Sequence, residues 1–227
     1  QYAEAVRGGA RKGFTGRRIT HIVHIGVGGS HLGCELACRA LNRSGIEIRF
    51  LANIDGAATT QSLTGLDPET TLFVIVSKTF TTLETLTNAH AARTWFLERT
   101  CDKTAIASHF VAVSNNAAEM TKFGIASVSQ FKLWDWVGGR FSLWSSVGIT
   151  IAIAIGAPEF RKFLSGAAIM DEHFREAPIA ENTPVILALL TIWNSNFLDS
   201  QSHAVLSYDS RLRTFVEFVQ QLEMESN

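Results

Sequence analysis

Short apolar segments alternate with helix-length amphipathic segments over residues 21–134, and this alternation constrains the fold more than any other feature. Apolar segments rich in β-branched and aromatic residues predict strands at 21–25, 46–52, 72–76, 109–113 and 131–134. The segments between them predict helices at 32–41, 57–63, 82–99 and 117–123. Such alternation is typical of α/β folds, so we expect a mostly parallel sheet flanked by helices.

The pattern changes after Gly138-Gly139, where the strand signals stop. The remaining chain predicts helices at 142–155, 158–174, 183–197 and 210–223, with one strand at 203–208. We therefore expect a first domain over residues 1–152 and a truncated second domain over 153–227. The chain begins at Gln1 rather than at a methionine and ends at Asn227 within a motif, so we expect a piece of a longer protein.

Composition excludes several classes of partner. The formal net charge is -1, from 20 basic and 21 acidic residues, so no basic excess indicates a nucleic acid or a membrane surface. The most apolar run, residues 147–157, is shorter than the ~20 residues that span a bilayer. An odd, low number of cysteines is typical of a reducing cytoplasm. Cys34 and Cys38 are expected to be core thiols, and the histidines show no metal-ligand spacing.

A glycine-rich turn, Gly26-Val27-Gly28-Gly29-Ser30, follows the first predicted strand. It resembles a dinucleotide-binding loop, but His31 stands where the third glycine of that motif belongs. The glycines allow a ligand to approach the backbone closely. An ordinary tight turn with a helix cap explains the segment equally well.

A second polar turn, Ser77-Lys78-Thr79-Phe80-Thr81-Thr82, leads from the third predicted strand into a long helix. Hydroxyls, an ammonium group and unpaired N–H groups at a helix N-terminus are what a phosphate group requires. Ligands of such sheets bind at the carboxyl ends of the strands, where both turns lie. The alternative is a capped helix start that is rich in threonine.

Two further segments contain candidate catalytic residues. In Trp134-Asp135-Trp136-Val137-Gly138-Gly139-Arg140 the glycines permit close approach of a substrate, and Arg140 could stabilise a developing oxyanion. The alternative is an aromatic core with a solvated arginine. Gln221 and Glu225 share one helix face, and Glu225 is a candidate general base near a sugar carbonyl. Spacing alone favours a solvated helix end for this pair.

Taken together, these motifs resemble the glucose-6-phosphate isomerase family, also called phosphoglucose isomerase. The resemblance rests on residues 25–33, 77–82, 134–145 and 224–227, which occur in the family's order and extend over essentially the whole chain. It implies two sugar-isomerase (SIS) domains, each a flavodoxin-like sandwich of parallel sheet and helices. It also implies interconversion of glucose 6-phosphate and fructose 6-phosphate through a cis-enediol, without metal or organic cofactor, in a cytoplasmic homodimer.

The resemblance assigns roles by position. Glu225 would move the proton between C2 and C1, while Arg140 and the Gly139 backbone would stabilise the enediolate and Gln221 would contact the sugar. The residues implied to hold or border the phosphate group are Gly29, Ser30, Ser77, Lys78 (through its backbone), Thr79 and Thr82.

The chain departs from the family pattern at His31, Cys34 and Leu222, where aspartate, proline and glycine are common. The family's ring-opening histidine, from the partner subunit, and its active-site lysine would lie beyond the end of this chain. We therefore expect this piece alone to have little or no isomerase activity. Alternatives are a SIS module that only senses sugar phosphates, a nucleotide-binding oxidoreductase, and an isomerase that also accepts mannose 6-phosphate.

Overall fold

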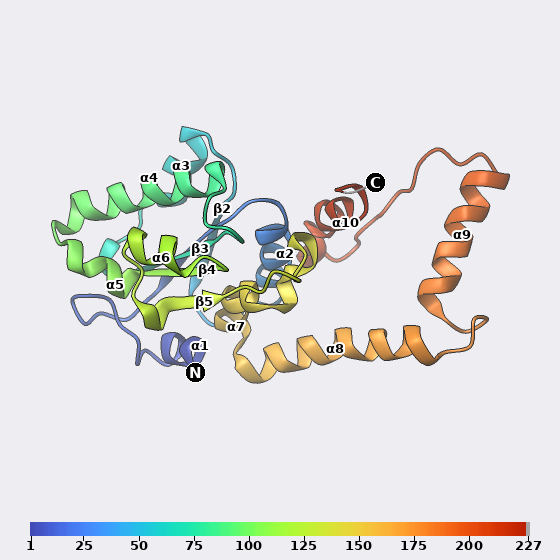
Figure 1. The fold of residues 1–227 in the computed structure, drawn as a ribbon, viewed down its shortest axis with the longest axis horizontal. Coiled ribbons are helices and arrows are strands. Elements are labelled where there is room, and N and C mark those ends of the chain that lie inside the picture. The colour runs from blue at the N-terminus through green and yellow to red at the C-terminus, as the bar shows by residue number, and fades with distance from the viewer. Residues whose placement is uncertain (226–227) are drawn as a thin grey trace.

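The computed structural model describes residues 1–225, and Figure 1 shows its ribbon. Within these residues a parallel sheet has the strand order β2-β1-β3-β4-β5. Its strands are β1 (His21–Ile25), β2 (Glu47–Leu51), β3 (Thr71–Val76), β4 (Phe110–Ser114) and β5 (Gln130–Lys132). Each neighbouring pair of strands is parallel, which confirms the predicted α/β class.

Both faces of the sheet are buried, because successive side chains of each strand point into different hydrophobic clusters. One cluster joins Val23, Phe73 and Phe110 to the helices on one face. These helices are α3 (Gly56–Leu63), α4 (Leu83–Thr100), α5 (Ile106–His109) and α6 (Ala117–Phe123). The other face packs against α1 (Tyr2–Arg7), α2 (Leu32–Leu41) and α7 (Ile149–Ile155). The sheet is therefore a complete three-layer core, as Figure 1 shows.

Helix α1 was not predicted, because its segment of six residues is too short to show a helical period. Two of its residues, Ala3 and Val6, are nevertheless buried in the cluster that contains α7. The Arg7 guanidinium donates to the carbonyl of Ile153 at 2.6 Å, and the Glu4 carboxylate accepts from the N–H of Ala157 at 2.6 Å. Helix α1 thus holds the end of α7 and the start of the next helix.

Beyond Gly156 the chain leaves the compact part. Helix α8 (Ala157–Glu176) leads away from the sheet, α9 (Thr183–Phe197) lies far from it, and a long connection returns to α10 (Phe215–Met224) beside α2 (Figure 1). Among residues 157–225 only Asn182 is buried. Its amide donates to the carbonyl of Phe174 at 2.8 Å and its side-chain oxygen accepts from the N–H of Val185, which caps α9.

Three predicted elements were wrong or displaced. The strand predicted at 203–208 is absent, and the segment forms no regular structure, because no neighbouring strand pairs with it within the described residues. The helix predicted at 142–155 is divided into 3₁₀ turns at Gly139–Trp144 and Ser146–Gly148, followed by α7. The helix predicted at 210–223 begins instead as a 3₁₀ turn at Ser210–Leu212 and continues as α10.

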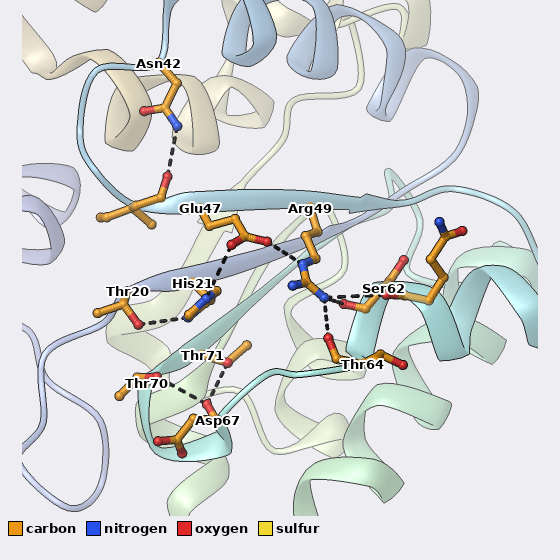
Figure 2. A network of polar contacts seen from close by, with 12 residues as sticks. Thr20, His21, Asn42, Glu47, Arg49, Ser62, Thr64, Asp67, Thr70 and Thr71 are labelled. Atoms are coloured by element: carbon orange, nitrogen blue, oxygen red, sulfur yellow. Dashed lines mark hydrogen bonds and ion pairs between the residues drawn. The ribbon is translucent and has the colours of Figure 1, made fainter.

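A polar network braces the edge strand β2 (Figure 2). The Arg49 guanidinium donates to the carbonyls of Ser62 at 3.1 Å and Thr64 at 2.7 Å, at the C-terminal end of α3. It also pairs with Glu47, whose other carboxylate oxygen lies 3.6 Å from the His21 ring. A cation at the last carbonyls of a helix is stabilising. This network fixes α3 to the edge of the sheet.

The prediction that Cys34 and Cys38 are core thiols is confirmed. Cys34 and Cys38 are buried, and burial raises the pKa of Cys34 to about 12, as expected for an inert core thiol. Among the described residues, no group of His, Cys, Asp and Glu side chains has the arrangement of a metal site. No helix in the same part of the chain combines the length and apolar character needed to cross a bilayer.

Candidate active site

The strand order places two of the predicted turns at one point of the sheet. In the strand order β2-β1-β3-β4-β5 the chain adds β2 on one side of β1 and then adds β3, β4 and β5 on the other, so the strand order reverses between β1 and β3. Ligands of α/β sheets bind at the carboxyl ends of the strands at such a point. The turn at 26–30 follows β1, and the turn at 77–82 follows β3. A Cβ atom at Gly26 would lie 3.2 Å from the carbonyl oxygen of Val76, so the two turns start in contact.

The first turn is a 3₁₀ segment, Gly28–Ser30, in which Gly28 has a φ of 55°. This left-handed conformation favours glycine. Helix α2 starts directly after it, with His31 as its N-cap and no side-chain cap. The Ser30 hydroxyl therefore does not cap the helix, although it stands at the turn where the sequence placed it.

His24, in β1, supports this turn from below. Its ring is fully buried and lies between the carbonyl oxygen of Ser30, 2.7 Å from Nε2, and the hydroxyl of Thr150 in α7, 2.9 Å from Nδ1. A carbonyl only accepts, so Nε2 carries the hydrogen and Nδ1 accepts from Thr150. Burial lowers the pKa of His24 to about 4, which keeps the ring neutral near pH 7. This confirms the prediction that His24 is a satisfied core residue.

The second turn gathers hydroxyl groups at the N-terminus of α4. The Ser77 hydroxyl donates to that of Thr82 at 3.2 Å, and the Thr79 and Thr81 hydroxyls lie 2.6 Å apart. Thr82 is the N-cap of α4 but makes no capping bond with its side chain. Phe80 is buried and anchors the turn in the core. Helix α4 has eighteen residues, and hydroxyl groups lie around its N-terminus. Such an N-terminus is well suited to bind an anion.

The third predicted segment lies against the first turn. A Cβ atom at Gly29 would be 2.2 Å from the carbonyl carbon of Gly139 and 2.5 Å from the nitrogen of Arg140. The Ser142 hydroxyl also donates to the carbonyl of Gly29 at 3.2 Å. The backbones of Gly29 and Gly139 are thus in direct contact, which brings Arg140 to the same site. The Arg140 guanidinium lies 5.0 Å from the centre of the Phe141 ring.

The last candidate pair reaches the site from α10. The Gln221 amide nitrogen lies 2.9 Å from the position that a Cβ atom would take at Gly28, and Phe218 packs against the core cluster below. Glu225 is the C-cap of α10, one turn after Gln221, and its side chain is exposed. The structure therefore brings Gln221 to the glycine turn and leaves Glu225 on the adjacent turn of the same helix. The rest of the fourth motif, residues 226–227, lies outside the described residues.

The His31 side chain bonds to the next turn of α2. Its Nε2 lies 2.5 Å from the Glu35 carboxylate, which also accepts from Arg39 at 2.6 Å. Burial alone would raise the pKa of Glu35, but the hydrogen bonds from His31 and Arg39 outweigh it and bring the pKa to about 2. His31 is thus engaged along α2.

Sequence reasoning missed some residues that hold the site together. Ser114 is the last residue of β4 and Asn115 follows it. Both bond to the second turn, because the Ser114 hydroxyl and the Asn115 N–H donate to the carbonyl of Lys78 at 2.9 and 2.8 Å. The sequence pattern predicted Ser142 and Thr150 only as parts of the helix at 142–155. Polar side chains after a buried parallel strand were a usable signal for Ser114 and Asn115, whereas no spacing rule indicated Ser142 or Thr150.

Comparison with known proteins decides the family. The family model described as Phosphoglucose isomerase matches residues 1–227. The chain belongs to the phosphoglucose isomerase family. The glucose-6-phosphate isomerase of Burkholderia orbicola is 52% identical over 229 residues, covering 100% of this chain and 42% of that protein. The Paraburkholderia phytofirmans enzyme of the same name is 51% identical with the same coverage. The chain thus spans about two fifths of the length of these curated relatives.

Solved structures give the same assignment. A glucose-6-phosphate isomerase from Chlamydia trachomatis superposes with a TM-score of 0.88 at 35% identity, covering 100% of this chain and 42% of that one. A hypothetical protein from Thermus thermophilus superposes with a TM-score of 0.81 at 27% identity, covering 98% of this chain and 52% of that one. The phosphoglucose isomerase fold therefore includes the extended region 157–225 as well as the sheet.

Proposed function

We propose that this chain supplies the phosphate-binding part and much of the catalytic part of an aldose-ketose isomerase acting on glucose 6-phosphate and fructose 6-phosphate. The proposal follows from membership of the phosphoglucose isomerase family. The observation that carries it is the contact of Gly29 with Gly139 and Arg140, beside the hydroxyl-rich turn of α4. That contact supports a proposed site in which an anion cradle and the Arg140 cation lie at the same end of the sheet.

In this proposal the phosphate group binds at the N-terminus of α4, between the two turns. The groups that face it are the hydroxyls of Ser30, Ser77, Thr79 and Thr82, with the backbone of Gly29 and Lys78 at its border. A phosphate held away from the reacting carbons orients the substrate and adds binding energy in the transition state.

The chemistry itself is a proton transfer next to a carbonyl group. Such a proton is weakly acidic, and the barrier falls when a preorganised cation or donor stabilises the enediolate. Arg140 and the Gly139 N–H are the groups proposed for that role. Glu225 is proposed to take the proton from C2 and return it to C1 through the cis-enediol, and Gln221 to contact the sugar. No metal or organic cofactor enters this scheme.

The remaining expectations stand as parts of the same proposal. We place the boundary between a first SIS domain and the start of a second after residue 152, within α7 and a few residues before burial ends at Gly156. The complete protein is proposed to be a cytoplasmic homodimer. Since the chain spans only 42% of its relatives, the chain alone is expected to have little or no isomerase activity.

The test is Glu225→Gln in the complete product of the reading frame that encodes this chain. The substitution keeps shape and removes the base, so kcat for isomerisation should fall about 10²–10⁴-fold. Inhibition by inorganic phosphate should stay within about threefold, because the cradle is unchanged. Glu217→Gln, exposed on the same helix, is the matched control and should leave both constants unaltered.

Unchanged kcat in Glu225→Gln would refute the base assignment. A wild-type protein that binds inorganic phosphate but catalyses no isomerisation would refute the enzyme proposal itself, and would favour a module that only senses sugar phosphates.

A further inference from the structure

The Lys78 ammonium group is directed at a protein loop. It donates to the carbonyl oxygen of Asp135 at 2.6 Å and to that of Val137 at 3.0 Å. An ammonium group has three N–H donors, so two of them are engaged by backbone carbonyls. The composition of the turn offered this charge to a phosphate group, and the family resemblance implied only the Lys78 backbone. The structure directs the charge to the segment that precedes Gly139 and Arg140.

The same loop is tied to the turn by a second route. The Lys78 carbonyl oxygen accepts from the N–H of Asn115 at 2.8 Å and from the Ser114 hydroxyl at 2.9 Å. The Asn115 amide in turn donates to the Asp135 carboxylate at 2.6 Å. Lys78 and Asn115 therefore connect the carboxyl ends of β3 and β4 to residues 135–137.

These connections end just before the two glycines of the loop. Val137 is buried in the core, and two glycines follow it before Arg140. Gly139 then contacts Gly29 on the opposite side. The position of Gly139 and Arg140 is thus set by an anchor at Val137 on one side and by the glycine turn on the other. Lys78 belongs to the phosphate turn and holds the first of these anchors.

We propose that Lys78 is a positioning residue, whose ammonium group fixes residues 135–137 so that Gly139 and Arg140 are held at a set distance from the phosphate turn. Its charge does not bind the phosphate group. One hydrogen-bonded unit thereby joins the phosphate turn, residues 77–82, to the loop that carries Arg140. The turn would receive the unreactive end of the substrate, and Arg140 would face the reactive end. The kinetic consequence rests on the proposed isomerase function, while the structural consequence does not.

The first experiment compares Lys78→Met with wild type in the complete protein. Methionine has a similar length and no donor, so the loop loses its anchor while the hydroxyls of the turn remain. Misplacement by about 1 Å can cost about 10²-fold in rate, so we expect kcat to fall about 10–100-fold. The inhibition constant of inorganic phosphate should change by less than about threefold. Lys122→Met, on the exposed face of α6, is the matched control and should change neither constant.

The second measurement needs no activity. Amide hydrogen exchange over residues 135–142 should be faster in Lys78→Met and unchanged in Lys122→Met, because local opening follows the loss of anchoring hydrogen bonds. Asn115→Ala removes the second connection and should act in the same direction. The double variant should be less than additive, since both residues hold one loop.

The outcomes separate the two proposals. A Lys78→Met protein with unchanged exchange at 135–142 would overturn the positioning role. So would a phosphate inhibition constant raised more than about tenfold with kcat unchanged, which would assign the charge to the phosphate group. If Lys78→Met does not fold, unchanged exchange in Asn115→Ala overturns the role equally. Faster exchange in a wild-type-like fold that has no isomerase activity would retain the positioning role and refute the enzyme proposal.

Discussion

The sheet-bearing part of the molecule, residues 1–155, and the region 157–225 differ in how they use apolar residues. In the first part β3 and β4 are buried along their whole length. In the second part α8, α9 and α10 contain no buried residue, although α9 has no charged side chain at all. Trp193, Phe197 and neighbouring leucines of α9 are exposed.

The difference shows that apolar composition alone does not make a core. A helix that is apolar on all sides is normally buried on all sides. Helix α9 lacks a partner surface among the described residues, while the sheet has helices on both faces. The sheet region, which holds the two turns and Arg140, is therefore packed on both faces, whereas α9 leaves apolar side chains uncovered within the described residues.

Matched substitutions test this comparison with the largest expected effect. Ile153 in α7 is 0% exposed and Ile192 in α9 is 51% exposed. Ile153→Ala should lower the free energy of unfolding of the chain by about 2–5 kcal/mol, because it leaves a cavity. Ile192→Ala should change it by less than about 0.5 kcal/mol. Urea unfolding followed by circular dichroism measures both values.

The complete protein sharpens the same test. If α9 is covered there, Ile192→Ala should cost about as much as Ile153→Ala. If Ile192→Ala changes the free energy of unfolding little in both the chain and the complete protein, α9 is not covered by a partner surface in the complete protein.

A second prediction concerns pH and is confined to the sheet region. His24 has a pKa of about 4 in the folded chain and about 6.5 when unfolded, so the unfolded state binds the extra proton. The stability that neutral His24 contributes is present above pH ~6.5 and is lost as the pH falls toward about 4, by about 3 kcal/mol.

Urea titrations across this pH range measure the loss. His24→Gln should be less stable near pH 7 and should show a flatter pH dependence. Some slope should remain, because burial also lowers the pKa of His109. An unaltered slope in His24→Gln would refute the assignment of this proton to His24.

The smallest of the three effects on stability is expected at Gly29. In Gly29→Ala the new Cβ atom would meet the backbone of Gly139 and Arg140, which must move. Overpacking of this kind costs about 1–3 kcal/mol. In the complete protein the isomerase rate should also fall, whereas Gly56→Ala, with open space around it and no left-handed backbone, should leave both the rate and the stability nearly unchanged. A Gly29→Ala enzyme of normal rate would refute the proposed contact as part of the site.

The fold of the sheet region could be predicted because each of its signals is local. The segments 21–25, 32–41 and 117–123 have the predicted bounds, since apolar period and flanking glycines mark them. The strand predicted at 203–208 failed for the opposite reason. A strand needs a neighbour, and the sequence pattern does not report whether one is present.

The candidate site shows the same division. The turns at 26–30 and 77–82 were predictable, because residue type and position at strand ends agree. The contact of Gly29 with Gly139 and the direction of the Lys78 side chain were not, because both depend on how distant segments pack. The sequence gives the kinds of group that meet a ligand, and tertiary packing determines which of them meet each other.

Helix α1 has a consequence for the order of events during synthesis. The strands and helices of the sheet can associate as they leave the ribosome, but the bonds of α1 join residues 146 and 153 positions apart in the chain. Contacts of such long separation form late, since the entropy of closing the loop opposes them. Helix α1 is therefore translated well before it can dock, and until Ala157 has emerged the face of α7 that it covers is open to chaperones.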